Sequence, residues 1–365
     1  MRVFHIAEGF GGGLYEVLRT VANRLVAEGH EMTIAYGRRL ETPEAVAEGF
    51  DPAVSLLPMR WERRSAGSQL AAARELRRLA RRAAPDVIHV HSSFAGAVAA
   101  LALPRGAPTI YTPHAYAFTR TSESRPRRAA YRSVEWMVAR RMGLVAATSH
   151  DEAALAREVL GAPRVTAVPN GIPELDDPSL EGPPPDGRAV AAMGRPGAQR
   201  RPEACARILS ALGEAAEPVW IGGGEPGSPG VAALLSAGVP VTGWLSHAEA
   251  LERLAGATAY LHWTAWDGLP LSILEAMARD VVVVASDIGP NREVLGAAQV
   301  AHDEASAAAL LRRVVDDRDF RESLLRCQRA RRSAYSAERM VREWLAVYRR
   351  MAAVPRGRAP RRDDW

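Results

Sequence analysis

Apolar residues along the chain follow two kinds of spacing in turn. Short, mostly apolar runs such as Val3–Ala7 are typical of buried strands, whereas apolar residues between Leu14 and Val26 recur every three or four positions, as in a helix. Strand-like and helix-like segments alternate along nearly the whole chain, which predicts parallel sheets covered by helices. The strands expected in the first half are Val3–Ala7, Met32–Tyr36, Asp86–His91, Thr109–Thr112, Leu144–Thr148 and Val165–Val168.

A stretch rich in Pro, Gly and Asp, residues 170–187, interrupts this pattern and predicts a linker. A second alternating series follows, with strands expected at Ala189–Met193, Pro218–Ile221, Val239–Thr242, Thr258–Leu261 and Val281–Ala285. The predicted fold class is α/β, with two Rossmann-like, doubly wound parallel-sheet domains. We expect an N-terminal domain at 1–169, the linker at 170–187, a second domain at 188–335, a last helix at 336–352 and a disordered Arg/Pro-rich tail at 353–365.

Capping boxes predict where two of the helices begin. Ser149 stands three residues before Glu152, and Ser246 stands three residues before Glu249. In this motif the serine hydroxyl accepts a hydrogen bond from the glutamate amide, and the glutamate carboxylate accepts one from the serine amide. A further helix is expected from about Leu269 to Arg279, directly after a predicted strand.

The composition is that of an ordinary globular protein. The chain has 365 residues, of which 47% are hydrophobic and 24% charged, so extensive disorder is excluded. Only Cys205 and Cys327 are present, which argues against a disulfide framework and favours a reducing compartment. No apolar run approaches the ~18 residues of a membrane span, and the N-terminus does not resemble a signal peptide. We therefore expect a cytoplasmic protein.

The charge is modestly basic, with a net value of +5, and every basic residue is an arginine. Such a balance suits anionic partners such as nucleotides, phosphates or acidic lipid surfaces. The segment Arg125–Arg141 carries six arginines together with Tyr131 and Trp136 and suits the inner face of an anionic membrane, which would make the protein peripheral there. A solvated helix with Trp136 partly in the core is an equal alternative. No nucleic-acid-binding module is visible, so nucleic acid is not an expected partner.

The stretch from Asp267 to Glu275 carries the most informative chemistry. Two carboxylates stand eight residues apart and flank a turn at Gly268–Pro270 and the start of a helix. Free N–H groups at a helix start favour anions, and the amide of Leu271 is available where Pro270 has none. A diphosphate would fit there between the carboxylates. On spacing alone, a strand–turn–helix with two solvated carboxylates remains an alternative.

This stretch resembles the E-x7-E signature of retaining glycosyltransferases of family 4, which have the GT-B fold. It keeps Gly268, Pro270, Glu275-Ala-Met-Ala and, further on, Glu293. It departs from the family pattern at three positions. Aspartate replaces the first glutamate at Asp267, aspartate replaces the glycine after the helix at Asp280, and Val282 replaces the following proline.

Other features of the family follow in the same order along the chain. Gly11, Gly12 and Gly13 follow the first strand and resemble the family's glycine loop, which lets backbone approach the donor diphosphate. A dinucleotide-binding loop is the competing interpretation, but Leu14 occupies the position of its third glycine. The segment Gly194–Arg200 resembles the family's phosphate clamp, with Arg200 in the place of a lysine.

Histidines at the ends of two strands complete the resemblance. His114 stands where the family often has a histidine near the reacting sugar and the phosphates. His89 and His91 belong to an H-x-H-S-S run like that of bacterial exopolysaccharide transferases, and we expect them to orient and pack rather than bind metal, since no third ligand is near in the sequence. Asp317-Arg-Asp319 is formally a D-x-D, but it lies in a charged connection and is read as a solvated face. No metal and no cofactor are expected.

The resemblance implies a function and a division of roles. It implies transfer of a sugar from a nucleotide diphosphate sugar, with UDP as the expected nucleotide, to an acceptor hydroxyl with retained configuration. Two facing domains would enclose a central cleft, and the last helix would pack back on the first domain. Expected catalytic residues are His114, Arg195, Arg200 and Asp267; expected donor-binding residues are Gly11, Gly12, Gly13, Arg195, Arg200, Gly268, Leu269, Leu271 and Glu275.

Glu275 would bind the ribose, Asp267 and the amides after it the sugar, and the two arginines the diphosphate. The acceptor is expected to be a glycan, in the first place a lipid-linked one of a surface polysaccharide. A soluble natural product is the second expectation. A catalytically silent protein that binds nucleotide sugar is a third, motivated by the departures at Asp267 and Asp280.

Overall fold

The computed structural model describes residues 1–39, 41–61, 66–176, 187–225 and 227–355. The chain divides into two compact units. Unit 1 comprises Met1–Thr119, Glu123–Gly171 and the segment that begins at Ala337, and unit 2 comprises Arg120–Ser122 and Ile172–Ser336. Residues 177–186 of the expected linker and 356–365 of the expected tail lie outside the described residues.

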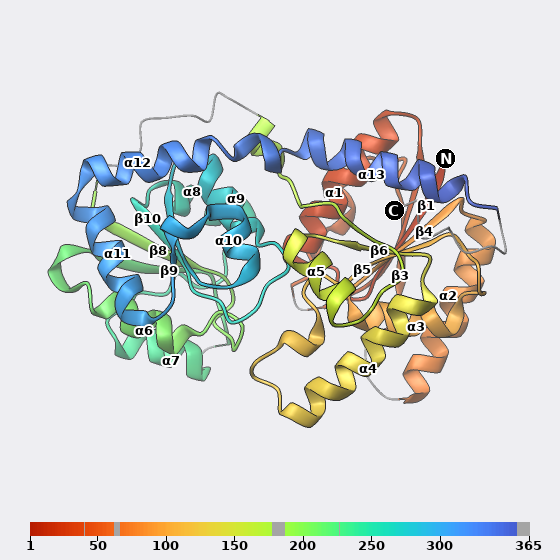
Figure 1. Ribbon diagram of the computed structural model, residues 1–365, viewed down its shortest axis with the longest axis horizontal. Helices are drawn as coiled ribbons and strands as arrows, with labels where there is room; N and C mark the ends of the chain where they lie inside the picture. Colours follow the sequence, from red (N-terminus) through yellow and green to blue (C-terminus); the bar gives the residue numbers. More distant parts are fainter. Residues whose placement is uncertain (40, 62–65, 177–186, 226, 356–365) are drawn as a thin grey trace. The chain divides into compact units, whose positions relative to one another are not determined.

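Unit 1 is built on a seven-stranded sheet in the order β3-β2-β1-β4-β5-β6-β7, with neighbouring strands parallel. The sequence order reverses beside β1, so that β1, β4 and β5 end next to one another at one edge (Figure 1). Ligands bind at such edges in doubly wound sheets. The strands are β1 Arg2–Ala7, β2 Glu31–Gly37, β3 Ser55–Met59, β4 Val87–His91, β5 Thr109–Thr112, β6 Leu144–Ala147 and β7 Val165–Ala167.

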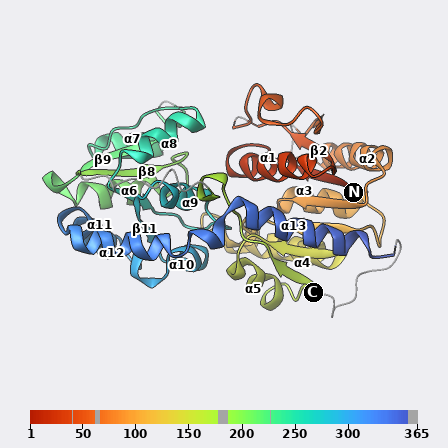
Figure 2. The same cartoon turned by 90° about the horizontal axis from the view of Figure 1, so that it is seen from above.

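Helices cover both faces of this sheet. Side chains of α2, α3 and α4 pack with one face of the strands in a single hydrophobic cluster. The last helix, α13, runs alongside α1 and packs against β4 (Figure 2). The helices of unit 1 are α1 Gly12–Ala27, α2 Ala66–Ala83, α3 Ser93–Ala102, α4 Arg125–Arg141, α5 His150–Glu158 and α13 Ala337–Ala352, with short 3-10 turns at Val46–Gly49 and Ala117–Thr119.

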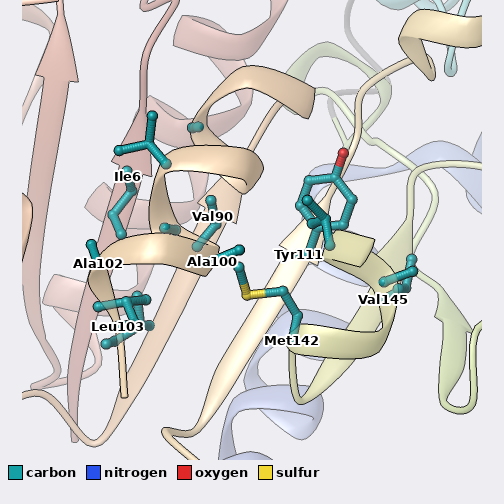
Figure 3. Packing of buried hydrophobic residues seen from close by; sticks show 14 of the residues in the cluster. Ile6, Val90, Ala100, Ala102, Leu103, Tyr111, Met142 and Val145 are labelled. Atoms are coloured by element: carbon teal, nitrogen blue, oxygen red, sulfur yellow. The ribbon is translucent and has the colours of Figure 1, made fainter. Parts of the chain in front are cut away.

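The two faces of the central strands carry different residues. Alternate positions of β1 and β4, such as Ile6 and Val90, enter the cluster under α3 and α4, where Met142 also packs (Figure 3). Burial of such side chains stabilises the fold by roughly 1.5–3 kcal/mol each. The intervening positions, His5, His89 and His91, are equally buried but face the other way, because successive side chains of a strand point to opposite faces.

Unit 2 is a five-stranded parallel sheet in the order β12-β11-β10-β8-β9. Helices α6, α7, α11 and α12 share a hydrophobic cluster with one face, and α9 packs on β10 and β11 (Figure 1). The strands are β8 Ala189–Met193, β9 Glu217–Ile221, β10 Ala259–His262, β11 Val282–Ser286 and β12 Val300–Ala301. The helices are α6 Pro202–Ser210, α7 Pro229–Ser236, α8 His247–Ala255, α9 Leu271–Ala278, α10 Gly289–Leu295, α11 Glu304–Asp316 and α12 Arg318–Arg329, with 3-10 turns at Pro173–Asp176, Gly213–Ala215, Ala297–Gln299 and Arg332–Tyr335.

The predicted fold class is confirmed, since both units are doubly wound parallel α/β structures. The strand expected at Val239–Thr242 is wrong, because only single bridges at Val241 and Gly243 reach the end of β9. Pro240 lacks the N–H that a continued ladder requires. Strand β3 was not expected, and it tolerates Pro58 because it lies at the edge of its sheet.

One capping box is confirmed and the other is only half formed. Ser246 and Glu249 make both reciprocal bonds at the start of α8. At α5 the Ser149 hydroxyl accepts from the Glu152 amide, but the Glu152 carboxylate accepts from Thr148 and Ala115 instead of the Ser149 amide. Glu152 therefore serves a neighbouring loop rather than its own helix.

Among the helices that the structure describes, none combines the length and apolar character needed to cross a bilayer.

Candidate functional site

Two loops of unit 2 are joined where β8 and β10 end. The first follows β8 at Gly194, whose φ of 126° is one that glycine adopts readily, and it runs to Arg201. The second follows β10. The Ala265 amide donates to the Gln199 carbonyl at 2.9 Å, and the Gln199 side chain donates to the Trp266 carbonyl at 2.9 Å. The two loops thus hold each other in register at the edge of the sheet.

Arg200 and Asp267, 67 residues apart in the sequence, meet between these loops. Arg200 Nη1 lies 3.0 Å from Asp267 Oδ2 and 3.1 Å from Nε2 of His262. Asp267 Oδ1 also accepts the Gly268 amide at 3.0 Å. His262 ends β10, and its other ring nitrogen is bonded to the Tyr260 hydroxyl at 2.9 Å. The sequence motifs predict Arg200 and Asp267 as site residues, but no motif marks His262.

The electrostatics of this cluster keep both charges in place. Burial alone would raise the pKa of Asp267, but the positive charge of Arg200 and the hydrogen bond from the Gly268 amide outweigh it and lower the pKa. Burial would likewise lower the pKa of Arg200, and Asp267 reverses that. Burial, with the positive charge of Arg200, lowers the pKa of His262 to about 4. At neutral pH the cluster therefore holds a charged pair beside a neutral imidazole.

Helix α9 begins after this cluster, so Asp267 lies outside the helix. Pro270 is the N-cap, Leu271 is the first helical residue, and the first turn contains no acidic side chain. The N-terminal amides and the helix dipole are thus oriented toward an anion without an internal carboxylate to neutralise them. The Gly268 amide, predicted to bind the donor, is bonded to Asp267 in this structure.

Glu275 lies in α9 and is 7% exposed. Its Oε1 lies 3.0 Å from Nε2 of His247, at the start of α8. Three residues before His247, the Trp244 side chain is 56% exposed. A Cβ at position 223 would lie only 2.6 Å from the Trp244 amide nitrogen, so the glycine there allows the Trp244 loop to approach the end of β9. No sequence motif marks His247 or Trp244.

Two further sequence features of unit 2 have structural explanations. Arg195 is exposed immediately after β8, at the start of the same loop as Arg200. Asp317 caps α12 by accepting from the Phe320 amide at 2.9 Å, which agrees with the structural interpretation of the D-x-D.

Two arginine side chains compensate for the aspartate at position 280, where the family pattern has glycine. Asp280 follows α9 with φ 54°, a left-handed conformation that glycine adopts at lower cost. Its carboxylate accepts two bonds from Arg329 at 2.9 Å and one from Arg332 at 2.5 Å, and its side chain is 2% exposed. Aspartate at this position therefore ties the end of α9 to the end of α12.

In unit 1 the predicted glycine loop begins α1 at the end of β1. Gly11 is the N-cap, and a Cβ there would lie 2.6 Å from the Glu41 carbonyl oxygen. Gly12 has φ 53° and Gly13 is exposed. The loop thus needs glycine both for close approach and for a left-handed residue, and it leaves the N-terminal amides of α1 accessible.

His114 follows β5 on the same edge, in a strained turn. His114 and Ala115 have φ values of 50° and 74°, which are unfavourable for residues with a Cβ. The buried Glu152 carboxylate accepts the Ala115 amide at 2.7 Å, and burial raises the pKa of Glu152 to about 7. Nε2 of His114 is bonded to Nδ1 of His91 at 2.9 Å. The turn is thus fixed from both sides.

The expectation that no third ligand accompanies His89 and His91 is wrong. The parallel register pairs His5 with His89, and one ring nitrogen from each of the three histidines lies within 4.8 Å of the others. His89, however, is engaged by Thr112 and Tyr348 through both ring nitrogens, each at 2.8 Å. A metal ion would have to displace one of those bonds, which fits the predicted orienting and packing role.

Two protein-family models match this chain, one over most of unit 1 and the other within unit 2. The family model described as Glycosyltransferase Family 4 matches residues 11–174, and the model described as Glycosyl transferases group 1 matches residues 231–332. A search of curated proteins finds no match.

Solved structures share the fold at low sequence identity. Sucrose-phosphate synthase from Thermosynechococcus elongatus has a TM-score of 0.82 and 16% identity, over 97% of this chain and 100% of the other. Anabaena HepE in complex with UDP and glucose has a TM-score of 0.76 and 14% identity, over 95% and 98%. A glycosyltransferase from Rickettsia africae has a TM-score of 0.69 and 15% identity, over 97% and 99%.

Proposed function

The chain belongs to glycosyltransferase family 4 and has the GT-B fold, and from this premise we propose that it transfers a sugar from UDP-sugar to an acceptor hydroxyl with retention of configuration. The observation that carries the proposal is the contact of Arg200 with Asp267 at the entrance of α9, in the unit that also holds Arg195 and Glu275. The UDP assignment draws on HepE, which was solved in complexes with UDP and with UDP-glucose.

Each proposed role follows from the chemistry of its side chain. The Glu275 carboxylate is suited to the two ribose hydroxyls, and His247 holds one of its oxygens in place. Arg195 and Arg200 supply positive charge to the diphosphate, as do the α9 amides beginning at Leu271. Asp267, still ionised beside Arg200, accepts hydrogen bonds from hydroxyls of the transferred sugar.

Trp244 is proposed to contact the base. Its exposed ring lies on the segment that leads directly to His247, the partner of Glu275. An aromatic face at that position gives a surface on which a base can stack, and such stacking contributes about 1–3 kcal/mol. The sequence of unit 2 thus provides separate groups for base, ribose, diphosphate and sugar.

The proposed step breaks the bond between the anomeric carbon and the diphosphate oxygen and forms a bond from that carbon to the acceptor oxygen. The acceptor proton passes to the leaving diphosphate. Arg195 and Arg200 stabilise the negative charge that develops on the leaving group, as fixed donors do in other enzymes. Because two guanidinium groups and a helix terminus supply this charge, we propose that the transfer is independent of metal.

The acceptor is proposed to be a lipid-linked glycan, reached at the inner face of an anionic membrane. Helix α4 of unit 1 exposes Trp136 by 49%, together with Val134 and Met137, among its arginines. Arg140 lies 4.2 Å from the Trp136 ring centre. Exposed apolar side chains among cations are the features by which interfacial helices bind acidic lipid surfaces.

Thermal stabilisation by a panel of nucleoside diphosphates tests the donor site. A ligand at 100 times its Kd stabilises a protein by about 2.7 kcal/mol. We expect UDP to stabilise the wild type, and Arg195→Ala and Glu275→Ala to abolish the effect. Arg207→Ala is the matched control, since Arg207 is an exposed arginine paired with Glu304 on the same unit. Folded protein that no nucleotide stabilises would overturn the donor assignment.

Hydrolysis of UDP-sugar without acceptor separates an active enzyme from a silent binding protein. Slow release of UDP, lost in Arg200→Ala, supports catalysis. Binding of UDP-sugar without hydrolysis, and without transfer to any lipid-linked or soluble acceptor tested, would favour the silent alternative.

A further inference from the structure

Arg200 is held from three sides at the carboxyl edge of the unit 2 sheet. Its Nη1 lies 3.0 Å from Asp267 Oδ2 and 3.1 Å from Nε2 of His262. Its side chain also packs on the backbone of Gly194, where a Cβ would lie only 3.3 Å from Arg200 Nε. Nη1 carries two hydrogens, one for each of its two acceptors. Nη2 and Nε have no hydrogen-bond partner among the residues that the structure describes, and the side chain is 22% exposed, so these two nitrogens are left for a ligand.

The contact with Arg200 fixes which nitrogen of His262 carries the proton. An arginine side chain has donors only, so Nε2 of His262 must supply a lone pair. Burial and the positive charge of Arg200 lower the pKa of His262 to about 4, so the ring is neutral near pH 7 and has a single N–H. That N–H is therefore on Nδ1.

The groups behind His262 accept this proton and leave no buried polar atom unpaired. Nδ1 of His262 donates to the Tyr260 hydroxyl oxygen at 2.9 Å, and the Tyr260 hydroxyl donates to the Ser272 hydroxyl at 3.0 Å. Burial raises the pKa of Tyr260 to about 12, so this hydroxyl keeps its proton. His262 and Tyr260 are both almost fully buried. The lone pair that His262 presents to Arg200 is thus fixed by the fold, without a ligand.

The two bonds at Nη1 set the direction of the whole guanidinium group. The acceptor atoms of Asp267 and His262 lie 3.6 Å apart. Since the two hydrogens of Nη1 lie on either side of the Cζ–Nη1 bond, a nitrogen that serves both acceptors points between them. Nη2 and Nε then lie behind Nη1, on the side away from Asp267.

Without His262, a different contact between Arg200 and Asp267 would be favoured. An arginine and a carboxylate prefer a fork of two parallel N–H···O bonds. Oδ1 of Asp267 accepts only the Gly268 amide among the described residues, so it has a lone pair for the second bond of a fork. In a fork Nη2 or Nε would face Asp267 together with Nη1, and that nitrogen would be lost to a ligand.

We propose that His262 is a positioning residue that prevents Arg200 from closing a two-bond fork on Asp267, and so leaves Nη2 and Nε of Arg200 to bind the diphosphate of the donor. This rests on the proposed function for the identity of the ligand. A neutral imidazole suits the task, because a second carboxylate at this position would orient Arg200 equally well but would repel a phosphate.

Structures of the ligand-free wild type and of His262→Leu test the constraint on Arg200 without a donor. We expect one bond between Arg200 and Asp267 in the wild type and two in His262→Leu, the second from Nη2 or Nε at about 3 Å. His262→Gln is the matched control, since its amide oxygen can replace Nε2 as the acceptor and should keep the single bond. A folded His262→Leu in which Arg200 keeps the single bond would overturn the proposal.

Long-range proton–nitrogen NMR of the wild type with 15N-labelled histidine keeps the proposal falsifiable if His262→Leu does not fold. The chain has nine histidines, and the signals lost in His262→Gln identify those of His262. We expect a protonated Nδ1 and an unprotonated Nε2 near pH 7. A protonated Nε2 would overturn the proposal, because it could not accept a hydrogen bond from Arg200.

Binding of UDP, which lacks the transferred sugar, measures the consequence for the ligand. We expect His262→Leu to weaken UDP binding about tenfold, the effect of one charge-assisted hydrogen bond, and His262→Gln to stay within about twofold of the wild type. Asp267→Asn should raise UDP affinity more in the His262→Leu background than in the wild type, because it removes the carboxylate that competes for Arg200. Additive effects of the two substitutions would overturn the proposal.

The outcomes separate this proposal from the proposed function. Failure of the wild type to bind UDP would contradict the proposed function. The structures and the NMR signals require no donor, so they would still decide whether His262 holds Arg200 away from a fork with Asp267.

Discussion

Asp280 gives a sharp test of how this chain tolerates a departure from its family pattern. Its carboxylate is 2% exposed and holds Arg332, whose side chain is 10% exposed, and Arg329, whose side chain is 38% exposed. Asp280→Asn keeps the size of the side chain and, like aspartate, tolerates φ 54°, so it removes the charge with little effect on the backbone. Arg332 would then lose the negative charge of Asp280, which its Nη2 contacts at 2.5 Å.

The expected loss in the free energy of unfolding is large for a substitution that replaces one carboxylate oxygen with an amide nitrogen. Removing one partner of a buried ion pair destabilises a protein by about 3–5 kcal/mol. For a unit of roughly 150–250 residues, each kcal/mol lowers the Tm by about 2–4 °C, so the transition of unit 2 should fall by about 6–20 °C. Donor affinity below that transition should stay within about twofold, because Asp280 follows the C-terminal end of α9 and Asp267 precedes its N-terminal end.

Urea and thermal unfolding of three variants measure this. Asp316→Asn is the matched control, since Asp316 is exposed at the end of α11 and should change stability by less than about 0.5 kcal/mol. Arg332→Met should cost less in the Asp280→Asn background than in the wild type, because the interaction between Arg332 and the Asp280 charge is already lost there. If Asp280→Asn lies within about 1 kcal/mol of the wild type, the clamp does not stabilise the protein and the reasoning fails.

Three further predictions concern the site, the membrane and pH. Asp267→Glu should keep or raise transferase activity, because the longer carboxylate can still reach Arg200. If neither the wild type nor Asp267→Glu is active, a catalytically silent protein that binds nucleotide sugar is favoured. Trp136→Ala should weaken binding to vesicles rich in anionic lipid about tenfold and leave binding to neutral vesicles unchanged in a sedimentation assay. Equal binding of the wild type and Trp136→Ala to the anionic vesicles would refute the proposal that α4 contacts the membrane. Burial lowers the pKa of His5, His114 and His262 to about 3, 4 and 4, so the unfolded chain takes up protons first as pH falls below 6.5. The stability that these three histidines contribute should be complete above pH 6.5 and lost toward pH 4, with His262 alone contributing about 3 kcal/mol of the loss. Glu152, whose pKa burial raises to about 7, offsets part of this loss, because the folded chain takes up its proton first. A urea midpoint that does not fall between pH 6.5 and pH 4 would contradict this.

The fold could be predicted from the sequence because its signals are local. Alternating strand and helix periods identify most elements wherever they lie in the chain, and parallel connections then follow from geometry. The wrong strand at Val239–Thr242 and the missed edge strand Ser55–Met59 both contain proline. Whether proline is tolerated depends on the neighbouring strand, which is a tertiary property.

The site residues likewise divide into those with a local sequence signal and those whose position depends on tertiary structure. Motif spacing indicated Asp267, but its contact with Arg200 depends on two loops meeting at adjacent strand ends. The position of His5 beside His89 could not be predicted, because it depends on the register of β1 on β4, which no local sequence pattern encodes. Trp244 follows a short turn and has no periodicity, so only its exposure in the fold marks it.

The two aspartates that depart from the family pattern are each stabilised by arginine, in different ways. Asp280 occupies a backbone conformation suited to glycine, but two arginines of unit 2 donate hydrogen bonds to its carboxylate, and these bonds compensate for the unfavourable backbone conformation. Asp267 keeps its negative charge, and its contact with Arg200 lowers its pKa, so the pair stays ionised where a donor would bind. A silent protein that binds nucleotide sugar would need the same charged pair, because the pair serves donor binding as well as catalysis. Donor hydrolysis by the wild type, lost in Arg200→Ala, is therefore the result that would separate an active transferase from the silent alternative.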